Sequence, residues 1–187
     1  MPHAPTFAQF KPSLAEAKIY EEEWEQSLEH QHYLTLENVF NNSDFSANAL
    51  LQKCTELNRA YHCLMFIPYA NAVQHLQNIP NLAKRLNEAD MSLVDEIANL
   101  DLNRFVFATM FCNHSNKKYY GYSQPIGEML VRLNNRDFFH EQTFEIGHLR
   151  IYENLFNVMT AFVAYYQLSG LTTTQLDIML KGAYYLY

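Results

Sequence analysis

Residues 136–168 read RDFFHEQTFEIGHLRIYENLFNVMTAFVAYYQL, and the spacing of apolar residues in this stretch indicates the fold class. Apolar side chains recur with the period of about 3.6 residues that marks one face of an α-helix. The residues that share this face are Tyr152, Leu155, Met159 and Tyr166. The pattern predicts one long helix from Arg136 to Leu168, ended by Ser169-Gly170.

Two carboxylates and an imidazole continue the apolar face at the start of this predicted helix. Glu141, Glu145 and His148 follow each other at intervals of four and three residues, so a helix would turn all three inward. Burying a bare carboxylate costs several kcal/mol, and two close carboxylates repel each other. Three explanations remain open: ligation of a metal, pairing with basic groups on other helices, or contact with water at the rim of the core.

The rest of the chain shows helical patterns separated by short breaks, and no sustained alternation typical of strands. Ser13 and Glu16 have the spacing of a capping box at a helix start. Further helices are expected over 13–32, 46–77 with a kink at Pro68, 82–86, 92–112, 125–133 and from 172 onward. The sequence therefore predicts an all-α, single-domain bundle of six or seven helices over residues 13–187. Residues 1–12, with three prolines, are expected to form an extended arm.

Composition and charge exclude several functional classes. The net charge is −7 and the sequence has no basic stripe to neutralise phosphates, which argues against a general nucleic-acid binder. No stretch approaches the roughly 20 apolar residues of a membrane span, and the N-terminus lacks the apolar core of a signal peptide. The three cysteines are an odd number without a CxxC motif, which favours reduced thiols. We therefore expect a cytoplasmic protein that binds neither membrane nor nucleic acid.

The segment FFHEQTFEIGH, residues 138–148, resembles the last ligand helix of the haem-oxygenase-like superfamily of thiaminase-type and di-iron oxygenase-type proteins. In the di-iron members this helix carries a histidine, an acid four residues on, and a histidine three further on. Glu141, Glu145 and His148 have that spacing. SLVDE, which ends at Glu96, is similar to the acidic helix start that supplies a further glutamate in those proteins. Asn103 stands where they carry a histidine.

This resemblance implies a haem-oxygenase-like fold and an iron or manganese site. The implied ligands are Glu96, Glu141, Glu145 and His148, with Glu128 as a bridging carboxylate. The chemistry implied is that of a metal-dependent oxidase or oxygenase that acts on a small organic molecule.

Two other functions remain open. The first is a non-catalytic helical protein with a degenerate site, which binds a protein partner or a second copy of itself through acidic and tyrosine-rich surfaces. The tyrosines that favour such a surface are Tyr119, Tyr120, Tyr122, Tyr184, Tyr185 and Tyr187. The second is a thiaminase-like hydrolysis without metal, which would need Cys63 or Cys112 as an activated nucleophile.

Overall fold

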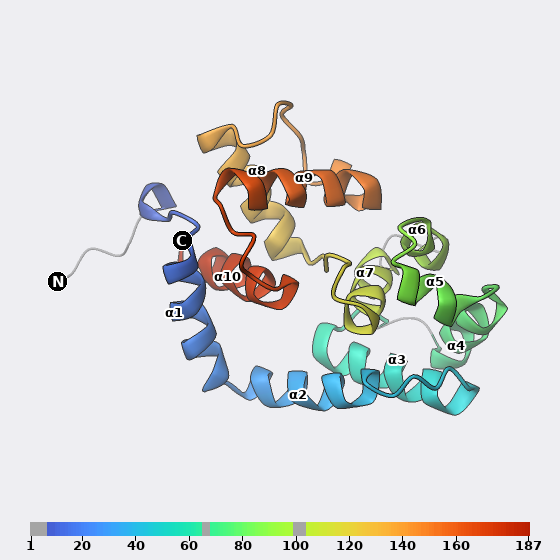
Figure 1. Cartoon of the computed structure of the whole chain (residues 1–187). Coiled ribbons are helices and arrows are strands. Elements are labelled where there is room, and N and C mark those ends of the chain that lie inside the picture. The colour runs from blue at the N-terminus through green and yellow to red at the C-terminus, as the bar shows by residue number, and fades with distance from the viewer. Residues whose placement is uncertain (1–6, 65–67, 99–103) are drawn as a thin grey trace. The chain divides into compact units, whose positions relative to one another are not determined.

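The computed structural model describes residues 7–64, 68–98 and 104–187, and these residues form helices and connecting loops without a strand (Figure 1). The all-α prediction is therefore confirmed. Ten α-helices lie in the described residues, more than the six or seven expected. They are α1 (Leu14–Glu25), α2 (Leu28–Phe40), α3 (Ala47–Tyr61), α4 (Tyr69–Asn78), α5 (Leu82–Glu88), α6 (Ser92–Ala98), α7 (Arg104–Ser115), α8 (Gln124–Asp137), α9 (Tyr152–Tyr165) and α10 (Thr173–Leu186). Two 3-10 helices, Phe7–Gln9 and His148–Arg150, complete the set.

The helix expected over residues 13–32 is two helices, because a serine caps the second. The backbone of Ser27 is extended, with φ −90° and ψ 160°, and its hydroxyl accepts a hydrogen bond from the His30 amide at 3.2 Å. An N-cap of this kind satisfies an amide that has no partner inside the helix. Ser13 caps α1 in the same way through the amide of Glu16, as expected.

The helix expected over residues 46–77 also divides, but earlier than the predicted kink at Pro68. α3 ends at Tyr61, and His62 follows with a left-handed backbone at φ 51°. Pro68 then stands as the N-cap of α4. The expected helix over 92–112 contains α6 and the first part of α7, and Asn103 lies outside the described residues.

The long helix predicted over residues 136–168 is wrong. α8 ends at Asp137, and Phe138 adopts a left-handed backbone at φ 52°. The buried side chain of Asn134 accepts a hydrogen bond from the His140 amide at 2.8 Å and donates one to the Gln142 carbonyl at 3.1 Å. These bonds satisfy the backbone of the turn after α8 without a helix. α9 begins only at Tyr152.

The chain forms two compact units, for which the sequence gives no signal. The middle unit is Ser27–Tyr122, and the terminal unit combines the chain up to Gln26 with Ser123–Tyr187. In the middle unit α2, α3 and α7 pack against one another, α4 packs on α3, and α6 packs on α7. In the terminal unit α10 packs against both α1 and α8.

The described part of the expected N-terminal arm, residues 7–12, is held against the terminal unit. The Arg136 guanidinium donates hydrogen bonds to the carbonyls of Phe7 at 2.9 Å and Phe10 at 2.7 Å. The side chain of Phe10 is completely buried, and its ring lies against those of Tyr20 and Tyr187. Phe10 thus belongs to the core of the terminal unit and anchors this segment there, while Ala8, Gln9 and Lys11 remain exposed.

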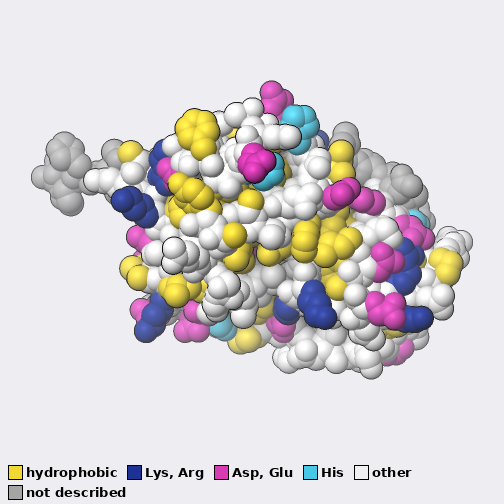
Figure 2. All heavy atoms as spheres, turned by 45° about the horizontal axis from the view of Figure 1, so that its top comes forward, with side chains coloured by type: hydrophobic (Ala, Val, Ile, Leu, Met, Phe, Trp, Pro, Cys, Tyr) yellow, Lys and Arg dark blue, Asp and Glu magenta, His cyan; other side chains and the backbone are white. Residues whose placement is uncertain are grey.

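Two surface expectations can be compared with the structure. Within residues 7–64, 68–98 and 104–187 no helix combines the length and the apolar character that a bilayer-spanning segment needs. On the face drawn in Figure 2, lysine and arginine side chains are separated by acidic and uncharged ones, without a continuous basic stripe among the described residues.

Candidate functional site

The acidic residues and histidine of the 138–148 segment face solvent. Glu141, Glu145 and His148 are all exposed, while Phe139 and Phe144 from the same segment are buried. The imidazole of His148 is turned back on its own loop, where Nδ1 accepts a hydrogen bond from the Glu145 amide at 3.3 Å. Because residues 138–147 are not helical, the spacing of four and three no longer places these groups on one inward face. The aromatic side chains take the buried positions in their place.

The other two predicted ligands have partners of a different kind. Glu128 accepts a hydrogen bond from the side-chain amide of Gln124, one turn earlier in α8, at 2.9 Å. Glu96, in the middle unit, pairs with the Arg85 guanidinium. In the part of the chain that the structure describes, no group of three or more His, Cys, Asp and Glu side chains is placed to hold a metal ion. The structure thus gives no geometric support to the iron or manganese prediction.

The cysteines lie in environments that oppose nucleophilic use. Cys54, Cys63 and Cys112 are all buried and unpaired with one another. Burial raises the pKa of Cys54 and of Cys63 to about 12, and it raises the pKa of Cys112 as well. A catalytic cysteine needs the opposite shift, because the thiolate is the nucleophile. The environments of the cysteines therefore do not support the hypothesis of thiaminase-like hydrolysis.

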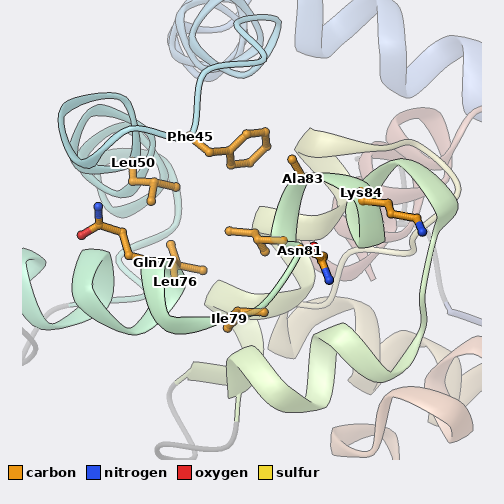
Figure 3. A pocket seen from close by; sticks show the side chains of 9 residues that line it. Phe45, Leu50, Leu76, Gln77, Ile79, Asn81, Ala83 and Lys84 are labelled. Carbon is orange, nitrogen blue, oxygen red and sulfur yellow. The ribbon is translucent and has the colours of Figure 1, made fainter.

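The middle unit contains an open pocket of about 450 Å³, formed where α3, α4 and α5 meet. Phe45, Leu50 and Leu76 point from three separate segments toward the same hollow (Figure 3). The full lining is Phe45, Leu50, Leu76, Gln77, Ile79, Asn81, Leu82, Ala83 and Lys84. Pockets of roughly 300–1,000 Å³ with mainly apolar walls are the usual form of binding sites in proteins.

The polar side chains at this pocket are amides and one lysine, and no carboxylate lines it. Gln77 and Asn81 are exposed at the rim. The side chain of Lys84 runs away from the hollow in Figure 3, and its ammonium lies 3.8 Å from the carboxylate of Glu88, one turn further along α5. The site is therefore a mainly apolar hollow with two side-chain amides at its edge and a lysine directed away from it.

A buried histidine joins three helices of the same unit. Nε2 of His114, at the end of α7, lies 2.9 Å from the hydroxyl of Tyr61 at the end of α3. Nδ1 lies 2.7 Å from a carboxylate oxygen of Glu37 on α2, which also accepts a hydrogen bond from Lys117 at 2.7 Å. A carboxylate only accepts, so Nδ1 carries the proton and Nε2 accepts from the Tyr61 hydroxyl when the imidazole is neutral.

Aromatic rings close this imidazole off from solvent. The ring centroids of Tyr33, Phe40 and Tyr61 lie 5.6, 5.5 and 5.8 Å from that of His114, whose side chain is 1% exposed. An imidazole enclosed in this way contacts no substrate directly. We interpret the cluster of Glu37, Tyr61, His114 and Lys117 as the polar lock that holds α2, α3 and α7 together.

The lock predicts a pH dependence of stability. Burial alone raises the pKa of Glu37, but the hydrogen bonds from His114 and Lys117 outweigh it and lower the pKa from 4.5 to about 2. A carboxylate with a lowered pKa in the folded state stabilises the protein above pH 4.5, and this contribution disappears as the pH falls toward 2. We expect the contribution to be about 1–3 kcal/mol.

Urea unfolding followed by circular dichroism between pH 7 and pH 2 measures this effect. The free energy of unfolding of the wild type should fall with acidity by about 1–3 kcal/mol more than that of Glu37→Gln. Glu29→Gln, which changes an exposed acid on the same helix, is the control and should follow the wild type. Parallel curves for wild type and Glu37→Gln would show that Glu37 does not carry the dependence.

Neither feature of the middle unit was found from the sequence. His114 falls in the segment that the sequence indicates as a loop, and its partners are 53 and 77 residues away along the chain. The pocket residues carry an ordinary amphipathic pattern that predicts core and not a hollow. The sequence offered one signal for the buried histidine: Tyr33 and Phe40, the aromatic residues whose rings frame it, each lie one helical turn from Glu37.

Comparison with known proteins gives one match. A family model described as HI_0787_N, N-terminal domain, matches residues 15–119, which are 105 of the 187 residues. No curated protein and no solved structure matches the chain. The matched residues include the whole lining of the pocket and all of the lock, from Glu37 to Lys117. The chain belongs to the HI_0787_N N-terminal domain family.

Proposed function

We propose that the chain is a helical protein-binding module whose middle unit takes a bulky apolar side chain of a partner segment into the pocket between α3, α4 and α5. The observation that carries the proposal is the open, apolar hollow of about 450 Å³ with amides at its edge. The sequence also left a non-catalytic protein-binding function open, with acidic and tyrosine-rich surfaces expected to bind the partner, whereas we now propose the pocket. Tyr119 and Tyr122, expected on a binding surface, are buried.

The walls supply the favourable energy. Phe45 and Ala83, which are half-buried, offer the accessible apolar surface of the hollow, and the other apolar residues that line it, Leu50, Leu76, Ile79 and Leu82, are buried. Transferring a leucine or phenylalanine side chain from water into such surroundings contributes about 1.5–3 kcal/mol. Interfaces commonly depend on a few anchors of this size seated in a pocket.

The rim favours a peptide as the carrier of that side chain. The side-chain amides of Gln77 and Asn81 each offer donors and an acceptor, and no hydrogen bond within the described residues occupies either of them. A peptide backbone presents the matching N–H and C=O groups on both sides of its side chain. A charged ligand would find no counterpart of opposite sign inside the walls, since Lys84 is directed toward Glu88.

Capped amino acids test the pocket without a known partner. N-acetyl-leucinamide and N-acetyl-phenylalaninamide should shift the methyl NMR signals of Leu50, Leu76 and Leu82 in a saturable way. Roughly 12 non-hydrogen atoms at about 0.3 kcal/mol each correspond to a Kd on the order of 1 mM. N-acetyl-glycinamide, which lacks the apolar side chain, should produce no saturable shift at the same concentrations.

A filled pocket provides the matched variant. Ala83 lines the hollow from α5, so Ala83→Phe should occupy it and raise the Kd for both apolar probes at least tenfold. Gln52→Phe adds the same ring to an exposed position of α3 that does not line the pocket and should leave the Kd unchanged. Absence of saturation in the wild type, or equal binding by Ala83→Phe, would refute the proposed function.

A further inference from the structure

We infer that Lys53 is a positioning residue for the pocket: its ammonium ties the loop before α3 to that helix and thereby fixes Phe45 as a wall of the hollow. The inference rests on the proposed function for its meaning in binding, but the contacts that carry it are independent of any partner. They lie entirely within the middle unit.

The ammonium of Lys53 is enclosed by the loop that carries Phe45. The residue is 1% exposed, and Nζ donates hydrogen bonds to the carbonyls of Asn42 at 2.7 Å and Asp44 at 3.0 Å. The same atom lies 4.1 Å from the ring centroid of Phe45 and 5.5 Å from that of Phe40. One cation thus holds two backbone carbonyls and the aromatic wall that follows them.

Ser46 caps the first turn of α3 by accepting hydrogen bonds from the amides of Ala49 at 3.4 Å and Leu50 at 2.9 Å, and the remaining bonds of this loop are local. The side chain of Asn42 accepts a hydrogen bond from the Asp44 amide at 2.9 Å. The carboxylate of Asp44 accepts from the amide of Ser46 at 2.8 Å and from its hydroxyl at 2.9 Å. These bonds shape the turn, whereas Lys53 connects the turn to the second turn of α3.

Fold stability alone does not explain a lysine at this position. Burial lowers the pKa of Lys53 because the enclosed ammonium loses hydration, and the nearby carboxylate of Asp44 opposes this effect. An apolar side chain of similar length fills such a space without that penalty. What an apolar side chain does not do is bind two carbonyls, and this is the property that fixes the loop.

A fixed wall matters for binding because a pocket whose shape is already set loses less conformational entropy when it is occupied. Phe45 is the one aromatic side chain of the lining. If the loop from Asn42 to Ser46 were free to move, the hollow would have to be formed at each binding event. Lys53 is therefore expected to affect the affinity for the probes more than it affects global stability.

Lys53→Met in the full-length chain separates these effects. Amide hydrogen exchange of Asp44 and Ser46, both hydrogen-bonded in the loop, should accelerate at least fivefold, and the Kd for N-acetyl-leucinamide should rise about three- to tenfold. Lys53→Arg, which retains a cation with several donors, should recover most of the affinity. Cys54→Ala, a core change at the next residue of α3, is the control for loss of stability and should leave the Kd unchanged.

Each result decides the inference. Unchanged loop exchange in Lys53→Met overturns it, and so does an affinity loss that Cys54→Ala reproduces at equal stability. If the wild type binds no probe, the proposed function fails and the exchange rates alone decide whether Lys53 fixes the loop. Should Lys53→Met not fold, Lys53→Gln, which is neutral but keeps one donor group, is measured in the same way.

Discussion

His114→Ala should lower the free energy of unfolding by about 3–5 kcal/mol, the largest loss that we expect from a single polar substitution in the middle unit. The change removes a completely enclosed ring from among three aromatic side chains and leaves a cavity. It also removes the hydrogen-bond partner of the Tyr61 hydroxyl. Glu37 loses one of its two hydrogen-bond donors and keeps only Lys117. Urea unfolding followed by circular dichroism measures the loss.

A double-mutant cycle with Glu37→Gln tests whether the lock acts as a unit. Because His114 and Glu37 share one hydrogen bond, the loss in the double variant should be smaller than the sum of the single losses by about 1–3 kcal/mol. Additive losses would mean that His114 stabilises the unit by filling space and not through its hydrogen bonds.

Gly182→Ala should destabilise the terminal unit by about 1–3 kcal/mol, even though alanine favours a helix more than glycine does. A Cβ atom at position 182 of α10 would lie 2.4 Å from Cδ1 and 2.9 Å from Cε1 of the Tyr20 ring on α1. Tyr20 is buried, so its ring has little room to withdraw. The fluorescence of Trp24, the single tryptophan of the chain and also on α1, reports the unfolding of this region.

Gly147→Ala is the matched control in the same unit. No atom lies within 4 Å of a Cβ built at Gly147, and its backbone, with φ −62°, suits any residue. This substitution should change stability by less than about 0.5 kcal/mol. Equal effects of the two substitutions would show that the approach of α1 to α10 does not depend on the missing side chain at position 182.

Local signals in the sequence predicted the helices well where a side chain close in sequence decides the outcome. Ser13 caps α1, and Thr172 with Gln175 forms the capping box of α10. The prediction failed where the deciding side chain acts over a loop, as Asn134 does for the segment after α8. Periodicity cannot register such a bond, because Glu141, Glu145 and His148 keep helical spacing with the apolar face that begins at Tyr152, although residues 138–147 are not helical.

The candidate site was less predictable than the helices. Spacing placed Glu141, Glu145 and His148 on an inward face only under the assumption of a helix, and the structure exposes all three. The pocket depends on how the ends of α3, α4 and α5 meet, and the lock depends on residues up to 77 positions apart. Such features arise from tertiary packing, which no local window of the sequence contains.

The placement of α1 bears on how the protein is divided for experiments. The family match begins at residue 15 and so includes nearly all of α1, yet Ala17 and Tyr20 of this helix are buried in the terminal unit, where α1 packs against α10. A fragment that ends at residue 119 would contain α1 without α10, so the apolar side of α1 would be exposed and would favour aggregation. A truncated chain that begins near Ser27 omits α1 and avoids this exposed apolar surface.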